Sequence, residues 1–331
     1  MKRAPSIDLF PVWPASWYLF GTSRELTQGP VSKTLLGRRL VAFKGDGGAV
    51  GGVTVMDANC SHLGADLGCG RIESGELVCP YHNWRYDRRG VCTRAPGTTR
   101  PPPFARQRVF PSVERHGYVF FFNGPQPLFS LPFFIDERAE DYEAGRVFCY
   151  EADCSWYLNS AHAFDRQHFD AVHDRRLLGP PEIDCPAPFA RRNRYRAEVL
   201  GRTRLDRLLR LGAGKFVEIS LTVWGGTFVC ITGDFQRARS RFLMVTRPLE
   251  NGHTLCQGIV LAHRPASRLA LQVRRFFTHG YLADEAQRIR GTRYDASRFV
   301  EADADMLDYF HWLVALPQEA ASVPEPENLH A

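Results

Sequence analysis

The sequence contains no hydrophobic run of the length that a membrane-spanning helix needs. Its longest fully apolar stretches, such as residues 118–122, are short, whereas a spanning helix needs roughly 18 to 20 apolar residues. We therefore expect neither an integral membrane protein nor a membrane partner. Residues 1–18 carry two basic residues and several prolines but lack the apolar segment of a secretory signal. From this we predict a cytoplasmic location.

Blocks of like charge are also missing. The chain has 42 Lys and Arg against 36 Asp and Glu, a formal net charge of +6, and the basic residues are scattered. This modest charge does not indicate a nucleic-acid partner. Nine cysteines, an odd number without an export signal, argue against a disulfide framework and favour metal ligation together with buried thiols.

The first half of the chain predicts a small all-β domain. With 331 residues and 44% hydrophobic content, the chain can form one large or two ordinary domains. Residues 16–123 consist of short β-rich runs separated by Gly and Asp, including an expected hairpin around His116 and Gly117. The Pro-rich stretch 125–132 is the most plausible linker, so we place the domain boundary at residue 128.

The second domain, residues 129–331, has a different pattern. Residues 155–178 indicate helix, and several longer β-type runs follow that are suited to an antiparallel sheet. Two helical stretches, residues 267–290 and 298–316, come after the strands. This order predicts an α+β domain. The Pro-, Glu- and Ala-rich residues 317–331 are expected to form a flexible tail.

Two predicted loops each offer one thiol and one imidazole: Cys60 with His62, and Cys79 with His82. A structural zinc site usually draws like ligands in pairs from one segment, as in C-x-x-C with H-x₃₋₅-H. The mixed arrangement suits a binuclear cluster in which each loop gives one ligand to each iron, as in a Rieske [2Fe–2S] centre. A zinc knuckle is the less favoured alternative.

A second constellation, D-x₂-H-x₄-H, comprises Asp165, His168 and His173. Asp165 and His168 share one face of a helix. His173 is five residues beyond His168, a rotation of about 140° in a regular helix, so both imidazoles can reach one metal only if the helix loosens or ends between them. Two histidines and a carboxylate form the ligand set of non-haem Fe(II) oxygenases.

The motifs C-x-H-L-G-A and C-P-Y-H-x-W-R-Y-D-x-x-G resemble, residue for residue, the Rieske motif of the Rieske non-haem iron oxygenases. Ala65 and Tyr81 stand where the respiratory and photosynthetic Rieske proteins have a disulfide, which favours the oxygenase branch. The D-x₂-H-x₄-H run resembles the catalytic-iron motif of the same family. The resemblance implies that His168 and His173 are iron ligands and that Asp165 connects the iron to a cluster across a subunit boundary.

In that family a carboxylate from a C-terminal helix completes the iron site. The candidates are Glu301, Asp303 and Asp305. We prefer Asp303, because the family's ligand Asp is usually followed by apolar residues three and four positions on, as here by Met306 and Leu307.

The resemblance implies an all-β Rieske domain, a helix-grip catalytic domain and a homotrimer. The implied activity is that of a terminal oxygenase, a monooxygenase-type oxidoreductase that uses O₂ and electrons relayed from NAD(P)H through a Rieske [2Fe–2S] cluster to a mononuclear Fe(II). The implied substrate is a small to medium apolar or aromatic molecule, which is hydroxylated, N-oxygenated or dealkylated. The sequence lacks a G-x-G-x-x-G dinucleotide fingerprint and a second ferredoxin-like cysteine set, so we expect an NAD(P)H-dependent reductase, a ferredoxin or both as partners.

Within the family, the segments SWYL, MDANCSHLGADL, GRI and HNWRYD are most similar to aminopyrrolnitrin oxygenase-like enzymes. The alternative function is a Rieske-type electron-transfer protein with a non-catalytic ligand-binding domain, which would not need the second constellation. The substrate, the reaction type and the role of His162 stay open. The amphipathic stretch 202–215 favours a solvated face over apolar packing, and docking of an acidic redox partner is the alternative.

Overall fold

The structure, a computed structural model, describes residues 2–45 and 52–317. The part of the expected flexible tail from residue 318 onward lies outside the described residues. By its internal contacts the chain divides into two compact units, one spanning residues 13–128 and the other residues 129–316 together with residues 2–12. No helix in the described ranges is both long and apolar enough to cross a membrane.

The first unit contains three antiparallel sheets, in the orders β1-β11-β10, β2-β3-β4-β9 and β5-β6-β7-β8. Their strands are β1 (Trp17–Thr22), β2 (Val31–Leu35), β3 (Arg38–Lys44), β4 (Val53–Asp57), β5 (Arg71–Glu73), β6 (Glu76–Val78), β7 (Arg85–Tyr86), β8 (Cys92–Arg94), β9 (Val109–Phe110), β10 (Ser112–Arg115) and β11 (Tyr118–Phe122). The prediction of an all-β domain is confirmed.

The hairpin between β10 and β11 forms where the sequence predicts it. His116 and Gly117 have φ angles of 54° and 77°, as a two-residue turn with the twist of the flanking strands requires. The turn pairs Arg115 with Tyr118 and brings β11, which is buried along its whole length, against β1. The continuous burial explains why the strand consists of aromatic and β-branched residues.

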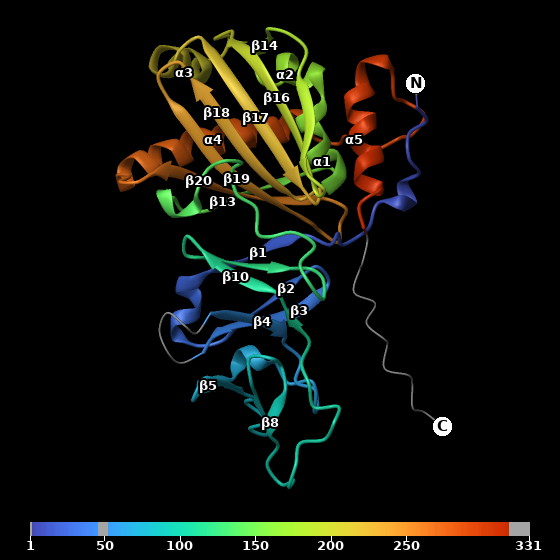
Figure 1. Ribbon diagram of the computed structural model, residues 1–331, viewed down its shortest axis with the longest axis vertical. Helices are drawn as coiled ribbons and strands as arrows, with labels where there is room; N and C mark the ends of the chain where they lie inside the picture. Colours follow the sequence, from blue (N-terminus) through green and yellow to red (C-terminus); the bar gives the residue numbers. More distant parts are fainter. Residues whose placement is uncertain (1, 46–51, 318–331) are drawn as a thin grey trace. The chain divides into compact units, whose positions relative to one another are not determined.

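The second unit is built on one antiparallel nine-stranded sheet in the order β12-β20-β19-β18-β17-β16-β14, with β13 pairing with β20 and β15 with β16 (Figure 1). Its strands are β12 (Tyr142–Ala144), β13 (Phe148–Ala152), β14 (Arg175–Leu177), β15 (Glu182–Ala187), β16 (Ala190–Val199), β17 (Phe216–Trp224), β18 (Phe228–Phe235), β19 (Arg239–Pro248) and β20 (Thr254–His263). Its helices are α1 (Trp156–Ala161), α2 (Arg166–Ala171), α3 (Arg204–Ala213), α4 (Arg268–Arg288) and α5 (Ala304–Val314).

The α+β class of this unit and its antiparallel sheet are confirmed. The two C-terminal helices are found as α4 and as α5, which the 3₁₀ turn η7 (Glu301–Asp303) precedes. The expected helix over 155–178 is wrong in detail. It splits into α1, the 3₁₀ turn η6 (His162–Phe164) and α2, and β14 begins at Arg175.

Long strands and aromatic side chains hold α1, α4 and α5 in place. Tyr309 and Phe310 of α5 are fully buried, and Tyr309 stacks on Phe164 with ring centroids 4.5 Å apart. At the other end of this core, the buried Phe148 ring of β13 occupies the space above Gly258 of β20, its register partner. A Cβ added at Gly258 would lie 2.1 Å from that ring.

Gly258→Ala is therefore expected to lower the free energy of unfolding by about 1–3 kcal/mol, because the buried ring has nowhere to move. Chemical denaturation measures the change. The matched control is Gly280→Ala in α4, where nothing lies within 4 Å of an added Cβ and a gain of up to about 1 kcal/mol is expected from helix propensity. Equal destabilisation by both substitutions would contradict this packing.

Candidate metal centres

Two loops of the first unit carry the predicted cluster ligands, and they have the same backbone geometry. Cys60 follows β4, and Cys79 follows β6. Gly64 donates its N–H to the carbonyl of Cys60 at 2.8 Å, and Asn83 donates to that of Cys79 at 3.1 Å. Gly64 and Asn83 both have positive φ, 77° and 56°, a region that Asn tolerates better than most residues. Each loop thus presents its Cys and His in the same way.

The four side chains form two separate pairs. The Nδ1 atoms of His62 and His82 lie 3.1 Å apart, and the buried thiols of Cys60 and Cys79 contact each other. In the described ranges, the one set of three or more ligand atoms that all lie within 4.8 Å of one another is found elsewhere in the chain. Four ligands 2.0–2.3 Å from one zinc ion would all lie within about 4 Å of each other. The pairs therefore fit a binuclear cluster better than a single metal ion.

Neighbouring groups hold these ligands in place. The Trp84 ring stacks on His62 with ring centroids 4.5 Å apart and an angle of 4° between the planes. The hydroxyl of Tyr86 lies 3.0 Å from Cys60 Sγ and 2.9 Å from the Ser61 hydroxyl. Burial and the neighbouring thiol raise the pKa of Tyr86 well above its ordinary value. The phenol therefore stays neutral and can donate to a cysteine sulfur, an interaction that tunes a cluster's potential.

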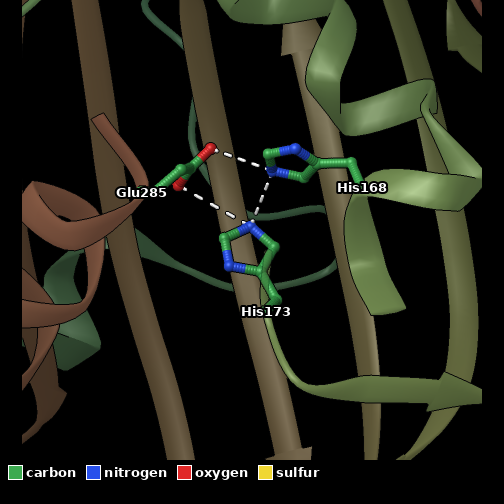
Figure 2. Close-up of side chains that lie close together, drawn as sticks. All are labelled: His168, His173 and Glu285. Carbon is green, nitrogen blue, oxygen red and sulfur yellow. Dashed lines mark hydrogen bonds and ion pairs between the residues drawn. The ribbon is translucent and has the colours of Figure 1, made fainter. Parts of the chain in front are cut away.

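The second centre begins at a helix end, as the spacing requires. Asp165 caps α2 by accepting hydrogen bonds from the backbone N–H groups of Gln167 and His168, at 2.9 and 3.1 Å. The helix ends at Ala171, so His173 lies in the turn that follows. This turn cancels the rotation between the two imidazoles, and their Nε2 atoms come within 3.0 Å (Figure 2).

A carboxylate from α4 completes the group. One oxygen of Glu285, Oε1, lies 3.1 Å from His168 Nε2, and its Oε2 lies 3.6 Å from His173 Nε2 (Figure 2). The three ligand atoms all lie within 4.8 Å of one another. Two imidazole nitrogens and one carboxylate on one side of a metal ion form the ligand set of mononuclear Fe(II) sites.

The structure brings Glu285 to the two histidines, and it does not bring the predicted Asp303 there. Asp303 does not belong to the group, because its side chain turns back to accept the N–H of Val300 at 2.9 Å at the start of η7. Asp305 pairs instead with Arg166, and Glu301 is exposed.

The sequence does hold a signal for Glu285. It shares a helical face with Leu282 and Ile289, which are both buried, and an acidic residue on the apolar side of a helix needs a partner. Sequence reasoning missed this because it looked for the carboxylate only in the last helix.

Burial and neighbouring groups shift the pKa values of His173, His162 and Glu285. Desolvation lowers the pKa of His173 to about 3 and that of the neighbouring His162 to about 4. Desolvation alone would raise the pKa of Glu285, but attraction to His173 and the hydrogen bond with His168 outweigh it and lower the value to about 2. Neutral imidazoles and an ionised carboxylate are the forms that bind metal ions.

The group faces a cavity of about 550 Å³ inside the second unit, within the range of small-molecule sites. Most of its wall is apolar, formed among others by Leu209, Ile219, Leu221, Ile231, Phe242 and Met244. The buried charges in the wall are paired, since Arg175 donates to Asp206 at 3.0 Å. His162 also lines the cavity and stacks on His168 with ring centroids 4.9 Å apart.

Comparisons with known proteins bear on the part of the chain that holds the first centre. Residues 16–111 match the Rieske [2Fe–2S] domain family. Aminopyrrolnitrin oxygenase PrnD of Pseudomonas fluorescens is 39% identical over 187 residues, 52% of this chain and 50% of that protein. The oxygenase component of a 3-ketosteroid-9-alpha-monooxygenase of Rhodococcus rhodochrous is 36% identical over 111 residues, 33% of this chain and 28% of that protein. The chain thus spans half or less of the length of these curated relatives.

Solved structures match over nearly the whole chain. Dicamba monooxygenase bound to 3,6-dichlorosalicylic acid has a TM-score of 0.66 at 18% identity, covering 92% of this chain and 97% of that one. NdmA of Pseudomonas putida CBB5 with caffeine has a TM-score of 0.66 at 20% identity, covering 90% and 89%. At this identity the match establishes the fold.

The buried histidines predict a pH dependence of stability for the metal-free protein. His162 and His173 are neutral when folded but titrate near pH 6.5 when unfolded, so the unfolded chain binds up to two more protons between about pH 6.5 and 4. Stability is therefore present above pH 6.5 and falls as the pH drops, by up to about 2.7 kcal/mol per pH unit from these two groups. Urea denaturation of the metal-free protein and its His162→Gln/His173→Gln variant measures the slopes. Parallel slopes would contradict the assignment.

Proposed function

We propose that this chain, in which residues 16–111 form a Rieske [2Fe–2S] domain and the whole adopts the fold of the Rieske non-haem iron oxygenases, is a terminal oxygenase. It oxidises an apolar or aromatic small molecule with O₂ and with electrons that originate from NAD(P)H. The observation that carries this proposal is the group of His168, His173 and Glu285 at the wall of a 550 Å³ apolar cavity. A Rieske electron carrier needs no such group, so the carrier reading is disfavoured.

The cluster is assigned to the two ligand pairs of the first unit. Cys60 and Cys79 would hold one iron through their buried thiolates, and His62 and His82 would hold the other through the Nδ1 atoms that face each other. The histidines are only partly buried, so a bound cluster would be accessible from their side. Tyr86 donates its hydroxyl to Cys60 and keeps the sulfur in a fixed orientation.

The mononuclear iron is assigned to His168, His173 and Glu285. When bound, the cluster supplies single electrons, and Fe(II) with open coordination positions supplies O₂ activation. The protein's own part is geometric. Asp165 fixes the start of α2 and with it His168, and the apolar wall excludes water from the substrate and holds it beside the open side of the group.

Asp165 has a second assigned role, as the residue that connects the iron to a cluster of a neighbouring subunit in a homotrimer. Its carboxylate is only partly buried, and one of its oxygens accepts both cap hydrogen bonds. The other oxygen is therefore available to a neighbour. An NAD(P)H-dependent reductase, with or without a ferredoxin, would supply the electrons, and we place the system in the cytoplasm.

The substrate assignment is limited to its class. The names of three similar proteins refer to aminopyrrolnitrin, to a 3-ketosteroid and to cholesterol. Apolar ring systems of this kind suit the apolar wall of the cavity. Hydroxylation, N-oxygenation and dealkylation all need the same metal group, so the reaction type depends on how the substrate lies in the cavity.

Removing a ligand of the iron group should separate the two metals. His168→Ala and Glu285→Ala are expected to lose the mononuclear iron and all turnover, while the visible spectrum of the cluster stays intact, because the two metals have separate ligand sets. Iron analysis after Fe(II) reconstitution measures the loss.

The matched control is Asp303→Ala, which should keep its iron, because that carboxylate only caps the η7 turn. Retained iron in Glu285→Ala together with lost iron in Asp303→Ala would return the ligand role to Asp303.

Asp165→Asn should keep both metals, because Asn also caps helices, but should slow electron transfer from cluster to iron at least about tenfold through loss of the negative charge. Rapid-mixing measurement of cluster oxidation in a single turnover gives the rate. A wild-type rate in this variant would rule out the connecting role.

A further inference from the structure

Helix α3 exposes apolar side chains, whereas the sequence favoured apolar packing beneath a solvated face. Leu208 is 58% exposed and Leu211 is 75% exposed. They are three residues apart and so lie on one side of the helix. The one acidic residue of this helix, Asp206, is buried and forms an ion pair with Arg175. No acidic side chain of α3 is therefore exposed beside the two leucines.

The N-terminal half of α4 exposes a second apolar stripe. Leu269 and Phe276 are 75% and 73% exposed, and Val273 and Phe277 are 45% and 40% exposed. Their spacing of four, seven and eight residues from Leu269 places them on one face of the helix. A solvated helix would carry polar residues on such a face.

Both stripes border the opening of the cavity. Leu208, Val273 and Phe277 line the cavity and are at the same time exposed, so the cavity reaches the surface between α3 and α4. We call the exposed apolar residues around it the rim face. It consists of Leu208, Leu211, Leu269, Val273, Phe276 and Phe277.

Arginines lie on the helices and in the turn beside the rim face. Five guanidinium groups on α3, on α4 and in the turn between β18 and β19 donate to backbone carbonyls, at distances such as 2.9 Å from Arg237 to Leu211 and 2.7 Å from Arg274 to Arg239. These five are Arg207, Arg210, Arg237, Arg274 and Arg275. Among the ion pairs of residues 2–45 and 52–317 none includes one of these five at a distance within 4.0 Å, although Glu198 attracts Arg210. A backbone carbonyl does not neutralise the charge of a guanidinium group.

We propose that the rim face docks on an anionic lipid surface, with the cavity opening toward the acyl chains so that an apolar substrate enters from the lipid. Exposed Leu and Phe flanked by Arg are the composition of surfaces that lie in the interface of an anionic bilayer. The expectation of no membrane partner rested on the lack of a spanning segment, which does not bear on peripheral docking.

An acidic protein partner fits these observations less well. A redox partner serves the cluster, whose ligands belong to the other compact unit, and six exposed apolar side chains need an apolar environment rather than carboxylates. Only the entry of a substrate into the cavity rests on the proposed oxygenase function. Docking is measured without turnover, so the docking proposal and the oxygenase proposal can each be contradicted separately.

The test is co-sedimentation of the full chain with vesicles of phosphatidylcholine, with and without 30% phosphatidylglycerol, where roughly a third of anionic lipid gives a strong surface potential. We expect binding to the anionic vesicles that weakens as salt is raised. Leu211→Gln/Leu269→Gln/Phe276→Gln should reduce the partition coefficient at least about tenfold through loss of apolar burial. Arg207→Gln/Arg237→Gln/Arg274→Gln, which removes three of the five charges beside the rim face, should weaken the salt dependence.

The matched control replaces three other exposed apolar residues, as Leu9→Gln/Leu178→Gln/Val300→Gln, and should bind as the unaltered chain does. Equal binding of the rim variant and this control would overturn the proposal. So would a rim variant that changes the oligomeric state in size-exclusion chromatography, since the face would then join copies of the chain. A third contradicting result is absence of vesicle binding while an acidic ferredoxin binds at this face.

Discussion

The group of two imidazoles and one buried carboxylate constrains how the second unit packs, because its members must meet from separate elements. His168 belongs to the short helix α2, His173 to the turn after it and Glu285 to α4. Glu285 is 117 residues further along the chain than His168. A buried ionised carboxylate is stable only when it is paired. The approach of Glu285 to His168 and His173 therefore requires α4 to lie along the sheet at one position, which the paired strands β13 and β20 support.

Much of the fold follows from local patterns. The all-β first unit, the long antiparallel strands and both C-terminal helices agree with the periodicity of the sequence, because their apolar residues alternate or recur with one dominant spacing. The region 155–178 does not follow such a pattern. Its apolar residues suit one long helix. Asp, however, is more favourable at a helix N-cap than in a helix interior, and Asp165 therefore caps a new helix that begins at Arg166.

In the candidate site, too, the sequence predicts what local motifs encode and not what depends on tertiary packing. The loops of Cys60 and Cys79 were found because ligands and turn residues lie together in short motifs, and the helix end before His173 follows from spacing alone. Glu285 was missed because a ligand that meets its partners only through tertiary packing leaves no local motif. The sequence signal for Glu285 is an acidic residue on the buried face of α4, beside Leu282. This signal indicates a ligand only when the helix is known to pack against the sheet.

The central claim is that one chain holds a [2Fe–2S] cluster and a separate mononuclear iron. The most direct test is analysis of iron and acid-labile sulfide in anaerobically prepared protein, with electron paramagnetic resonance of the dithionite-reduced sample. We expect about three irons and about two sulfides per chain, with the low average g-value of a histidine-ligated cluster. About two irons and about two sulfides that persist after Fe(II) reconstitution would contradict the central claim, because the group at Glu285 would then hold no metal.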